Sequence, residues 1–363
     1  MAQADWRRRA RDFAETLILA ILGGSLLGFA GVPAGFLSGA LLVVAAAAVA
    51  GRPTFVPDGI ARLIFFLLGV ILGSAVSPET LTGMATWPLS IVALAVAMTA
   101  IFFCIGGYLR LVHGWDPLSA YFAAAPGALS QVVVMSVEAK ANLPAIVIVQ
   151  TVRVMLLAIC VPLLLSRLDG GAMPVILATP PIQGDMLGEL VVLFAVCAAG
   201  AALVTWIRFP GGIIFGAMAA SAVLHGAGWI EAKLPGWVVI CSMIGIGSIT
   251  GSRFKGTSPA MLLRYLGAAL GSFAVGLAVL VVIAGLLIVL FPFRLGDVIL
   301  AFAPGAQEVM LLLALALNGA PVYIGAHHVA RYFLVSMALP VFMRVYGPRP
   351  EAVAVRAPAP GGE

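Results

Sequence analysis

Residues 123–134 have the sequence AAAPGALSQVVV and residues 301–310 have the sequence AFAPGAQEVM, so one Ala-Pro-Gly-Ala tetrapeptide interrupts two apolar stretches. Proline removes a backbone donor and clashes inside a helix, and glycine weakens a helix further. Each Pro-Gly pair therefore predicts a break in an apolar helix, and polar side chains follow both breaks closely. These breaks, at Pro126 and Pro304, decide the fold that the sequence predicts.

The composition is that of an integral membrane protein. Of the 363 residues, 62% are hydrophobic and 10% are charged, and the mean hydropathy is +1.13. Soluble domains carry about 25% charged residues. Because one bilayer crossing takes about 20 apolar residues, the chain has room for about ten to twelve helices. We expect an all-α polytopic fold with a cytoplasmic tail at 1–12 and a disordered tail at 346–363.

The charges and the cysteines argue against several classes of function. The net charge of +5 does not indicate nucleic-acid binding, because the basic residues are spread over short loops. The cluster from Arg7 to Arg11 precedes the first apolar segment and predicts a cytoplasmic N-terminus. A second apolar segment follows at once, which favours an uncleaved span over a signal peptide. The four cysteines lie singly in apolar runs, which predicts core residues rather than disulfides or metal ligands.

The two breaks belong to an internal repeat. Arg153 and Arg331 are the same number of residues apart as Pro126 and Pro304, and so are the members of several Gly, Ser and Pro pairs. In pairs nearer the start of the chain, the two members are one residue closer together. Residues related in this way are equivalent positions of the two halves. Agreement among the rare Pro and Arg residues indicates duplication. The predicted organisation is a first membrane repeat at 13–166, a linker at 167–185 and a second membrane repeat at 186–345.

The relative direction of the repeats depends on whether a Pro-Gly segment crosses the membrane or dips in and returns. Six crossings per half give parallel repeats, and five give inverted repeats. With five crossings, and the intramembrane Arg153 and Arg331 set aside, fifteen basic residues are cytoplasmic and three are outside; six crossings give thirteen and five. Lys and Arg prefer the cytoplasmic side, so the inverted arrangement is favoured. If a Pro-Gly segment instead crosses the whole membrane as a broken helix, the inverted arrangement requires that an earlier apolar segment does not cross.

Four stretches resemble the AbrB-type bacterial membrane protein family, whose members carry this duplication over nearly the whole chain. They are AYFAAAPGALSQVVVMS and VQTVRVMLLAICVPLLL in the first half, and VILAFAPGAQEVMLLLA and HHVARYFLVSMALPVFM in the second. The family pattern has a second Gly and an acidic residue after the Pro-Gly pair. Here Ala128 and Ala306 replace that Gly, and only the second half has the acid, Glu308. The two loops are therefore not expected to act symmetrically.

The resemblance implies a fold more than an activity. Members of the family are often labelled transcriptional regulators or ammonia monooxygenases. A DNA-binding regulator needs an exposed basic domain, which this sequence does not contain. A monooxygenase needs a metal or flavin site, and the four histidines form no recognisable ligand set. The family is also distantly similar to inverted-repeat cation/proton antiporters and bile-acid symporters, which implies paired broken helices near the bilayer midplane.

Two facing breaks would form a site at the midplane. A broken helix leaves N–H and C=O groups that are tolerated at membrane depth only inside protein or beside water, where they can meet a ligand. The alternative is that each Pro-Gly pair only kinks a packed helix. Asp116 and Asp297 begin the two segments and are expected to cap helices. The candidate substrate- or ion-binding residues are Pro126, Gly127, Ser130, Gln131, Gln150, Arg153, Pro304, Gly305, Gln307, Glu308, His327, His328 and Arg331.

The two intramembrane arginines need partners, because a charge within an apolar helix costs at least a few kcal/mol. We expect Arg153 and Arg331 beside the breaks, where they cap freed carbonyls, pair with Glu308 or bind a substrate carboxylate. His327 and His328 lie near Arg331 on the helix surface and are either proton-coupling groups or packed neutral side chains. Glu308 is the strongest candidate for a coupling residue.

The function that the sequence favours is secondary transport of a small solute, coupled to an ion such as H+ or Na+. No nucleotide-binding GxxxxGK[ST] loop occurs, which argues against an ATP-driven pump. The alternative is a membrane-bound sensor or regulator of gene expression that acts through partner proteins. We expect no enzymatic activity, cofactor, metal or nucleic-acid partner. The expected location is the bacterial inner membrane, and a homo-oligomer is compatible with the sequence.

Overall fold

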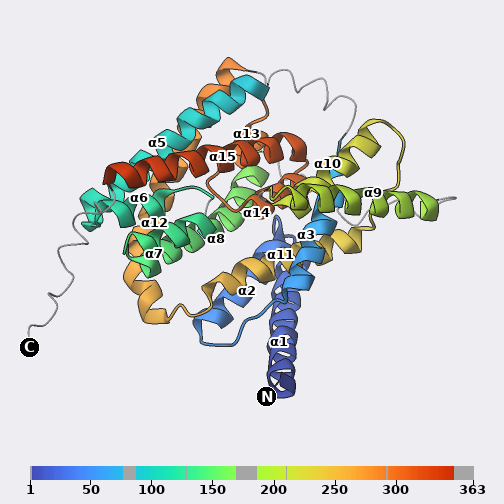
Figure 1. Cartoon of the computed structure of the whole chain (residues 1–363), viewed down its shortest axis with the longest axis horizontal. Helices are drawn as coiled ribbons and strands as arrows, with labels where there is room; N and C mark the ends of the chain where they lie inside the picture. Colours follow the sequence, from blue (N-terminus) through green and yellow to red (C-terminus); the bar gives the residue numbers. More distant parts are fainter. Residues whose placement is uncertain are drawn as a thin grey trace, which may run out of the picture.

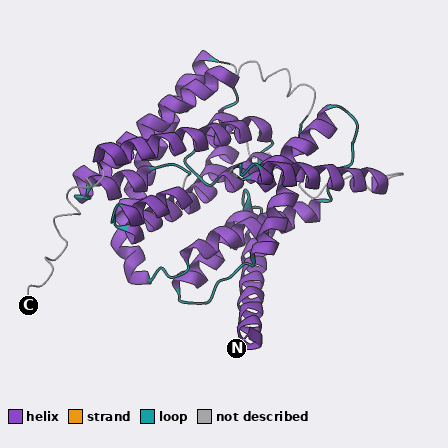
Figure 2. Cartoon of the chain, viewed as in Figure 1, coloured by secondary structure: helices purple, strands orange, loops and turns teal. Residues whose placement is uncertain are grey.

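The structure is a computed structural model that describes residues 2–76, 87–127, 129–168, 186–209, 211–291 and 293–346. Within these ranges it contains fourteen α-helices, one 3-10 turn and no strand (Figure 2). The all-α prediction is confirmed. The expected linker and C-terminal tail lie outside the described residues, apart from their first one or two positions.

The helices follow the apolar segments of the sequence. In the first half they are α1 (Ala2–Phe29), α2 (Gly35–Val49), α3 (Asp58–Gly73), α5 (Trp87–His113), α6 (Pro117–Ala124), α7 (Leu129–Glu138) and α8 (Leu143–Leu168). In the second half they are α9 (Met186–Trp206), α10 (Gly212–Gly226), α11 (Gly236–Gly251), the 3-10 turn η2 (Ser252–Phe254), α12 (Pro259–Leu290), α13 (Leu295–Phe302), α14 (Gln307–Ala316) and α15 (Pro321–Tyr346). Helix α1 begins at Ala2, so most of the expected tail at 1–12 continues the first helix.

The chain is a multi-pass membrane protein. Seven of the described helices are long and apolar enough to cross a bilayer: α1, α5, α8, α9, α11 with η2, α12 and α15. Their outward faces expose large apolar side chains, as expected of helices that contact lipid. Examples on α5, α9 and α12 are Val92, Val96, Leu187, Val191, Val282 and Val289.

The cysteines divide between the core and the surface. Cys197 is buried and Cys160 is half-buried, but Cys104 and Cys241 are exposed on the outward faces of their helices. The expectation that all four are core residues is therefore wrong for two of them. The exposed thiols of Cys104 and Cys241 face outward from α5 and α11. Cysteine behaves as a small hydrophobic residue, so it is as well accommodated in an apolar surrounding as in a protein core.

The helices form two bundles, and each bundle takes helices from both halves of the chain (Figure 1). The first bundle contains α1–α3 and α9–α11, with α2 packed on α11 and α3 packed on α10. The second bundle contains α5–α8 and α12–α15, with α5 packed on α12. The bundles meet where α14 contacts α3 and α11 and where α2 contacts α8. Both Pro-Gly segments belong to the second bundle.

Glycines bring the helices of the first bundle into close contact. A Cβ atom on Gly69 of α3 would lie 2.8 Å from Cβ of Ala217 on α10. A Cβ atom on Gly247 of α11 would lie 2.8 Å from Cβ of Ala40 on α2. Gly69 and Gly247 are equivalent positions of the two halves, and so are Ala40 and Ala217. The same glycine–alanine contact is therefore made twice. The first half supplies the glycine in one contact and the alanine in the other.

The close contact at Gly247 predicts a stability change. Gly247→Ala places a methyl group against the backbone of α2, and overpacking of this kind costs about 1–3 kcal/mol. The matched control is Gly285→Ala within α12, where an added Cβ meets no atom within 4 Å. Thermal unfolding in detergent should show a lower Tm for Gly247→Ala and an unchanged or higher Tm for Gly285→Ala. Equal melting temperatures would show that α2 and α11 are not in close contact.

Candidate functional site

Both Pro-Gly pairs break a helix, as the sequence predicts. Helix α6 ends at Ala124 and α7 begins at Leu129, so the first break contains Pro126 and Gly127. Helix α13 ends at Phe302 and α14 begins at Gln307, so the second break contains Pro304 and Gly305. Proline cannot continue the hydrogen-bond ladder of the preceding helix, which accounts for the position of each break.

Each broken segment is a hairpin whose two ends lie together. In the second half, the amide of Ala320 donates to Oδ1 of Asp297 at 2.8 Å, which joins the end of the segment to its beginning. In the first half, the amide of Asn142 donates to Oγ of Ser119 at 2.8 Å. Both donors and both acceptors are at equivalent positions of the two halves. The α6–α7 and α13–α14 segments therefore each end close to where they begin.

The two aspartates differ in what they bind. Asp116 precedes α6, and its Oδ1 accepts the amide of Ser119 at 2.9 Å, so the predicted cap is confirmed. Helix α13 instead has Arg294 at its N-cap, and Asp297 lies within its first turn. Asp297 was also expected to cap a helix; it is not the N-cap of α13, and its carboxylate accepts the amide of Ala320, which directly precedes α15.

A buried arginine lies at the tip of each hairpin. Arg153 of α8 donates from Nη1 to the carbonyls of Ala123 at 3.2 Å and Ala124 at 3.4 Å, and from Nη2 to that of Ala125 at 3.1 Å. A helix end leaves such carbonyls without partners, and the guanidinium supplies donors for them. The expected position of Arg153 beside the first break is therefore confirmed.

Arg331 of α15 does the same at the second break. Its guanidinium donates to the carbonyl of Ala303 through Nη1, and to that of Gly305 through Nη2 at 3.0 Å. Both arginines are almost fully buried, with 1% exposure for Arg153 and 2% for Arg331. Of the roles considered for these arginines, carbonyl capping is the one seen among the described residues.

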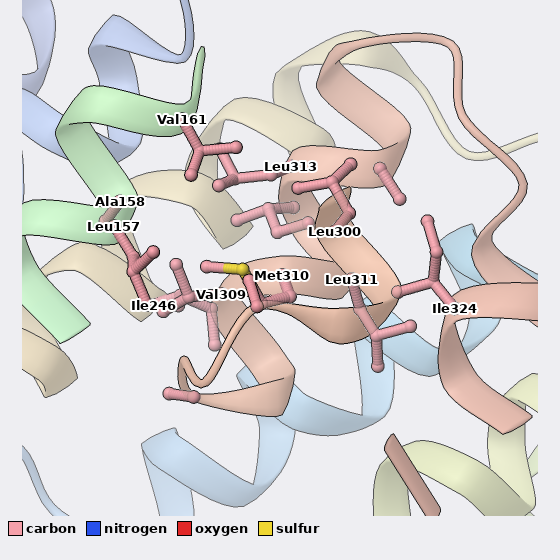
Figure 3. Close-up of a cluster of buried hydrophobic side chains, with 14 of the residues drawn as sticks. Leu157, Ala158, Val161, Ile246, Leu300, Val309, Met310, Leu311, Leu313 and Ile324 are labelled. Atoms are coloured by element: carbon pink, nitrogen blue, oxygen red, sulfur yellow. The ribbon is translucent and has the colours of Figure 1, made fainter. Parts of the chain in front are cut away.

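The tips of the two hairpins meet. Gly127 of the first tip has φ of +78°, a conformation that glycine adopts most readily. A Cβ atom there would lie 3.0 Å from Nη2 of Arg331, so the guanidinium that caps the second break also lies against the first. Figure 3 shows the packing around the second tip, where Leu157 of α8 faces Met310 of α14.

Gln150 and His328 occupy equivalent positions on α8 and α15 but have different partners. Nε2 of Gln150 donates to the carbonyl of Phe122 at 2.8 Å, which adds a further bond to the end of α6. His328 is 1% exposed, and neither of its ring nitrogens makes a well-formed hydrogen bond within the described part of the chain, although the carbonyl of Leu300 lies nearby. Burying a polar group without a good partner is costly, so His328 is an unusual residue in this core.

His327 lies toward α5 rather than toward the tips. Its Nδ1 is 2.8 Å from the carbonyl of Tyr323, and its Nε2 is 2.8 Å from Oγ of Ser90. Since a carbonyl only accepts, Nδ1 carries a proton. The histidine therefore joins α15 to α5 through Ser90, a partner that the sequence did not predict.

Glu308 forms its ion pair with Arg253, whereas the sequence offered Arg331 as one alternative partner. Its Oε1 accepts a short hydrogen bond from Nη2 of Arg253, and Glu308 is buried while Arg253 is half-buried. Arg253 lies in η2 of the first bundle, and Glu308 lies in the first turn of α14 in the second. The ion pair therefore joins the two bundles beside the hairpin tip.

Arg253 is one of the basic residues that the count with five crossings assigns to the cytoplasmic side, and its pairing with Glu308 was not predicted. The sequence did contain an indication of this pair: the first half has Ala75 at the position equivalent to Arg253 and Ser130 at the position equivalent to Glu308. An acid and a base that are both present in one half, while their equivalent positions in the other half carry neither, are candidates for an ion pair.

The remaining candidate residues contribute less to the described geometry. Gln307 lies near the start of α10, since a Cβ on Gly211 would be 2.6 Å from its Nε2. The side chains of Ser130 and Gln131 lie outside the described residues. Among the described residues, no three His, Cys, Asp or Glu side chains are grouped as metal ligands.

These features define a polytopic α-helical membrane protein with two arginine-capped hairpins that meet at their tips. The chain belongs to the AbrB family: residues 36–347 match the family model described as "Transition state regulatory protein AbrB". It is 24% identical over 359 residues to "Uncharacterized protein YhjN" of Bacillus subtilis (strain 168), which covers 91% of each chain. It is 25% identical over 298 residues to "Putative regulator AbrB" of Escherichia coli (strain K12), covering 79% of this chain and 83% of that one.

The arginine caps predict a large loss of stability on substitution. Arg153→Met keeps the length of the side chain but leaves three buried carbonyls without their donor, and each hydrogen bond to a charged group contributes about 1.5–3 kcal/mol. Unfolding in detergent should show a loss of about 3 kcal/mol or more. The control is Arg167→Met at the exposed end of the same helix, which should change stability by less than about 0.5 kcal/mol. Equal stability of the two variants would contradict the capping role.

Proposed function

We propose that this protein is a secondary transporter of a small solute, with its site at the meeting tips of the two hairpins. The observation that carries the proposal is the position of Arg331, which caps the second break and lies against Gly127 of the first. Irregular backbone at membrane depth is tolerated where it lies in protein or lines a cavity, and transporters build midplane sites from such broken helices.

The proposed architecture is a pair of inverted repeats. The exchanged contacts of Gly69 and Gly247, and the matching hydrogen bonds at the hairpin bases, support a two-fold relation between the halves. A hairpin that returns to its own side leaves five crossings in each half, and an odd number places the second half upside down. The hairpins then enter from opposite sides of the membrane, as the distant similarity of the family to antiporter and symporter folds implies.

The same topology supports an inner-membrane location with the N-terminus in the cytoplasm. It places only Arg167, Lys233 and Arg294 outside among the basic residues that are not within spans. An excess of Lys and Arg on the cytoplasmic side is the usual charge bias of bacterial inner-membrane proteins.

The two bundles give the site a means of changing its exposure. The tips belong to the second bundle, but the carboxylate of Glu308 is bound by Arg253 of the first. Movement of one bundle against the other around a midplane site is a general mechanism of alternating access. Under this proposal the pair opens and closes as the bundles move, no residue performs a catalytic step, and H+ or Na+ provides the coupling.

A membrane sensor is the second candidate. The printed names of the matched family model and of the Escherichia coli relative contain the words "regulatory" and "regulator". Such a protein would bind a solute at the same tips and act through a partner protein without moving the solute. Solute flux separates the two functions, because only a transporter carries a bound ligand across a sealed membrane.

The test is uptake of a stabilising ligand into proteoliposomes, with Glu308→Gln as the critical variant. A ligand is first found by thermal shift, since a compound that binds the folded state stabilises it by mass action. Wild-type protein should carry the labelled ligand with a rate that depends on pH. Glu308→Gln should remain folded and bind the ligand but lose that pH dependence, because its amide cannot titrate.

The control is Glu138→Gln, which changes an exposed carboxylate at the end of α7 and should leave flux unchanged. Ligand binding without flux in the wild type would contradict transport and favour the sensor. If flux through Glu308→Gln keeps its pH dependence, Glu308 is not the coupling residue, but the protein is still a transporter.

A further inference from the structure

We propose that the site at the hairpin tips binds a small organic carboxylate, with a dicarboxylate preferred. This inference rests on the proposed site and adds the chemical class of its solute. The charges, the buried donors and the exposure of the residues at the tips favour this class of solute.

Positive charge exceeds negative charge at the tips. Arg153, Arg331 and Arg253 contribute three positive charges there, and Glu308 contributes one negative charge, which is already bound by Arg253. Two formal positive charges remain, on the two most deeply buried arginines. Their carbonyl partners carry only partial charges, and an uncompensated charge in a low-dielectric interior is costly.

The hairpins add positive potential to the same place. Helices α7 and α14 both begin at the tips, and the N-terminus of a helix carries about half a positive charge. In α14 the negative charge of Glu308, which lies in the first turn, compensates this positive potential. The corresponding position of α7 is Ser130, which has no charge, so the first tip is the more favourable location for an anion.

Buried donors at the tips lack well-placed acceptors. Nε of Arg153 makes no hydrogen bond within the described residues, although Arg153 is 1% exposed and this nitrogen always carries a proton. His328 is also 1% exposed, and among the described residues the carbonyl of Leu300 is the one acceptor near its ring, although the two form no well-aligned hydrogen bond. Gln150, at the position equivalent to His328, donates to a carbonyl in the same place on α6. Groups that need acceptors are suited to a ligand that is rich in oxygen.

A ligand can approach these groups at Gly127. This residue is exposed although Pro126 beside it and Arg331 behind it are buried. Gly127 has no side chain, and a Cβ atom there would lie 3.0 Å from Nη2 of Arg331, so the backbone of this exposed residue lies directly against the guanidinium. Carboxylates pair well with the planar donors of arginine, and a dicarboxylate matches the two positive charges that remain.

The experiment is a thermal-shift titration of the purified full-length protein in detergent. Sodium succinate and sodium acetate are compared with sodium chloride and methylammonium chloride at equal ionic strength. A ligand present at about 100 times its Kd raises the Tm of the folded state by a few degrees. Succinate should give the largest shift and acetate a smaller one, while the two chloride salts should give none.

The critical variant is His328→Gln, which installs the side chain that the equivalent position already has. The new amide can bind the nearby carbonyl of Leu300, as Gln150 binds that of Phe122, so this variant should fold. It should weaken the response to succinate by about tenfold in apparent Kd, as expected for the loss of one hydrogen bond to a charged group. His113→Gln, at the exposed end of α5, should leave the response unchanged.

The outcomes separate the anion class from transport itself. Stabilisation by methylammonium and not by carboxylates would overturn the inference, and uptake of that amine into proteoliposomes would leave the transporter proposal standing. Stabilisation by succinate without uptake of labelled succinate would support the carboxylate site and contradict transport. Absence of any shift with either carboxylate would overturn the inference, and so would an equal loss of response in His328→Gln and His113→Gln.

Discussion

A backbone carbonyl inside a membrane must have a donor, and this constraint governs the whole structure. Each Pro-Gly pair ends a helix in the interior and leaves carbonyls that no water reaches. Arg153 and Arg331 supply the donors from the helices that follow each hairpin. In turn, the backbone carbonyls stabilise two arginines that an apolar helix would otherwise tolerate poorly. The break and the arginine therefore depend on each other, and each half of the chain contains both.

Differences between the halves account for the proposed chemistry better than their similarities do. The helices, breaks and arginine caps correspond between the two halves, but the ionisable side chains do not. His328 stands opposite Gln150, and the Glu308–Arg253 pair has no counterpart in the first half. The shared features build the scaffold and bring the tips together. The features found in one half alone supply a carboxylate, an imidazole and a contact between bundles, which a solute and a coupling ion can use.

Local features made most of the fold predictable from the sequence. The positions of the breaks follow from Pro and Gly themselves, and the arginines had to lie beside the breaks because few other groups in an apolar chain could accept their hydrogen bonds. The partner of Glu308 could not be predicted in the same way. Arg253 follows an apolar helix and resembles a loop residue, and only the contact between the bundles brings it to the tip. The same limit applies to Asp297, whose partner Ala320 lies beyond the return of the hairpin.

Whether the two hairpins enter from opposite sides of the membrane can be measured by cysteine accessibility. Lys140 and Asn318 are exposed residues at the bases of the first and second hairpins, at equivalent positions of the two halves. Each is changed to cysteine in a variant without the four native cysteines, and intact cells are treated with a membrane-impermeant maleimide. We expect Asn318→Cys to be labelled in intact cells and Lys140→Cys to be labelled only after the membrane is permeabilised. Labelling of both positions from the same side would show that the hairpins do not enter from opposite sides.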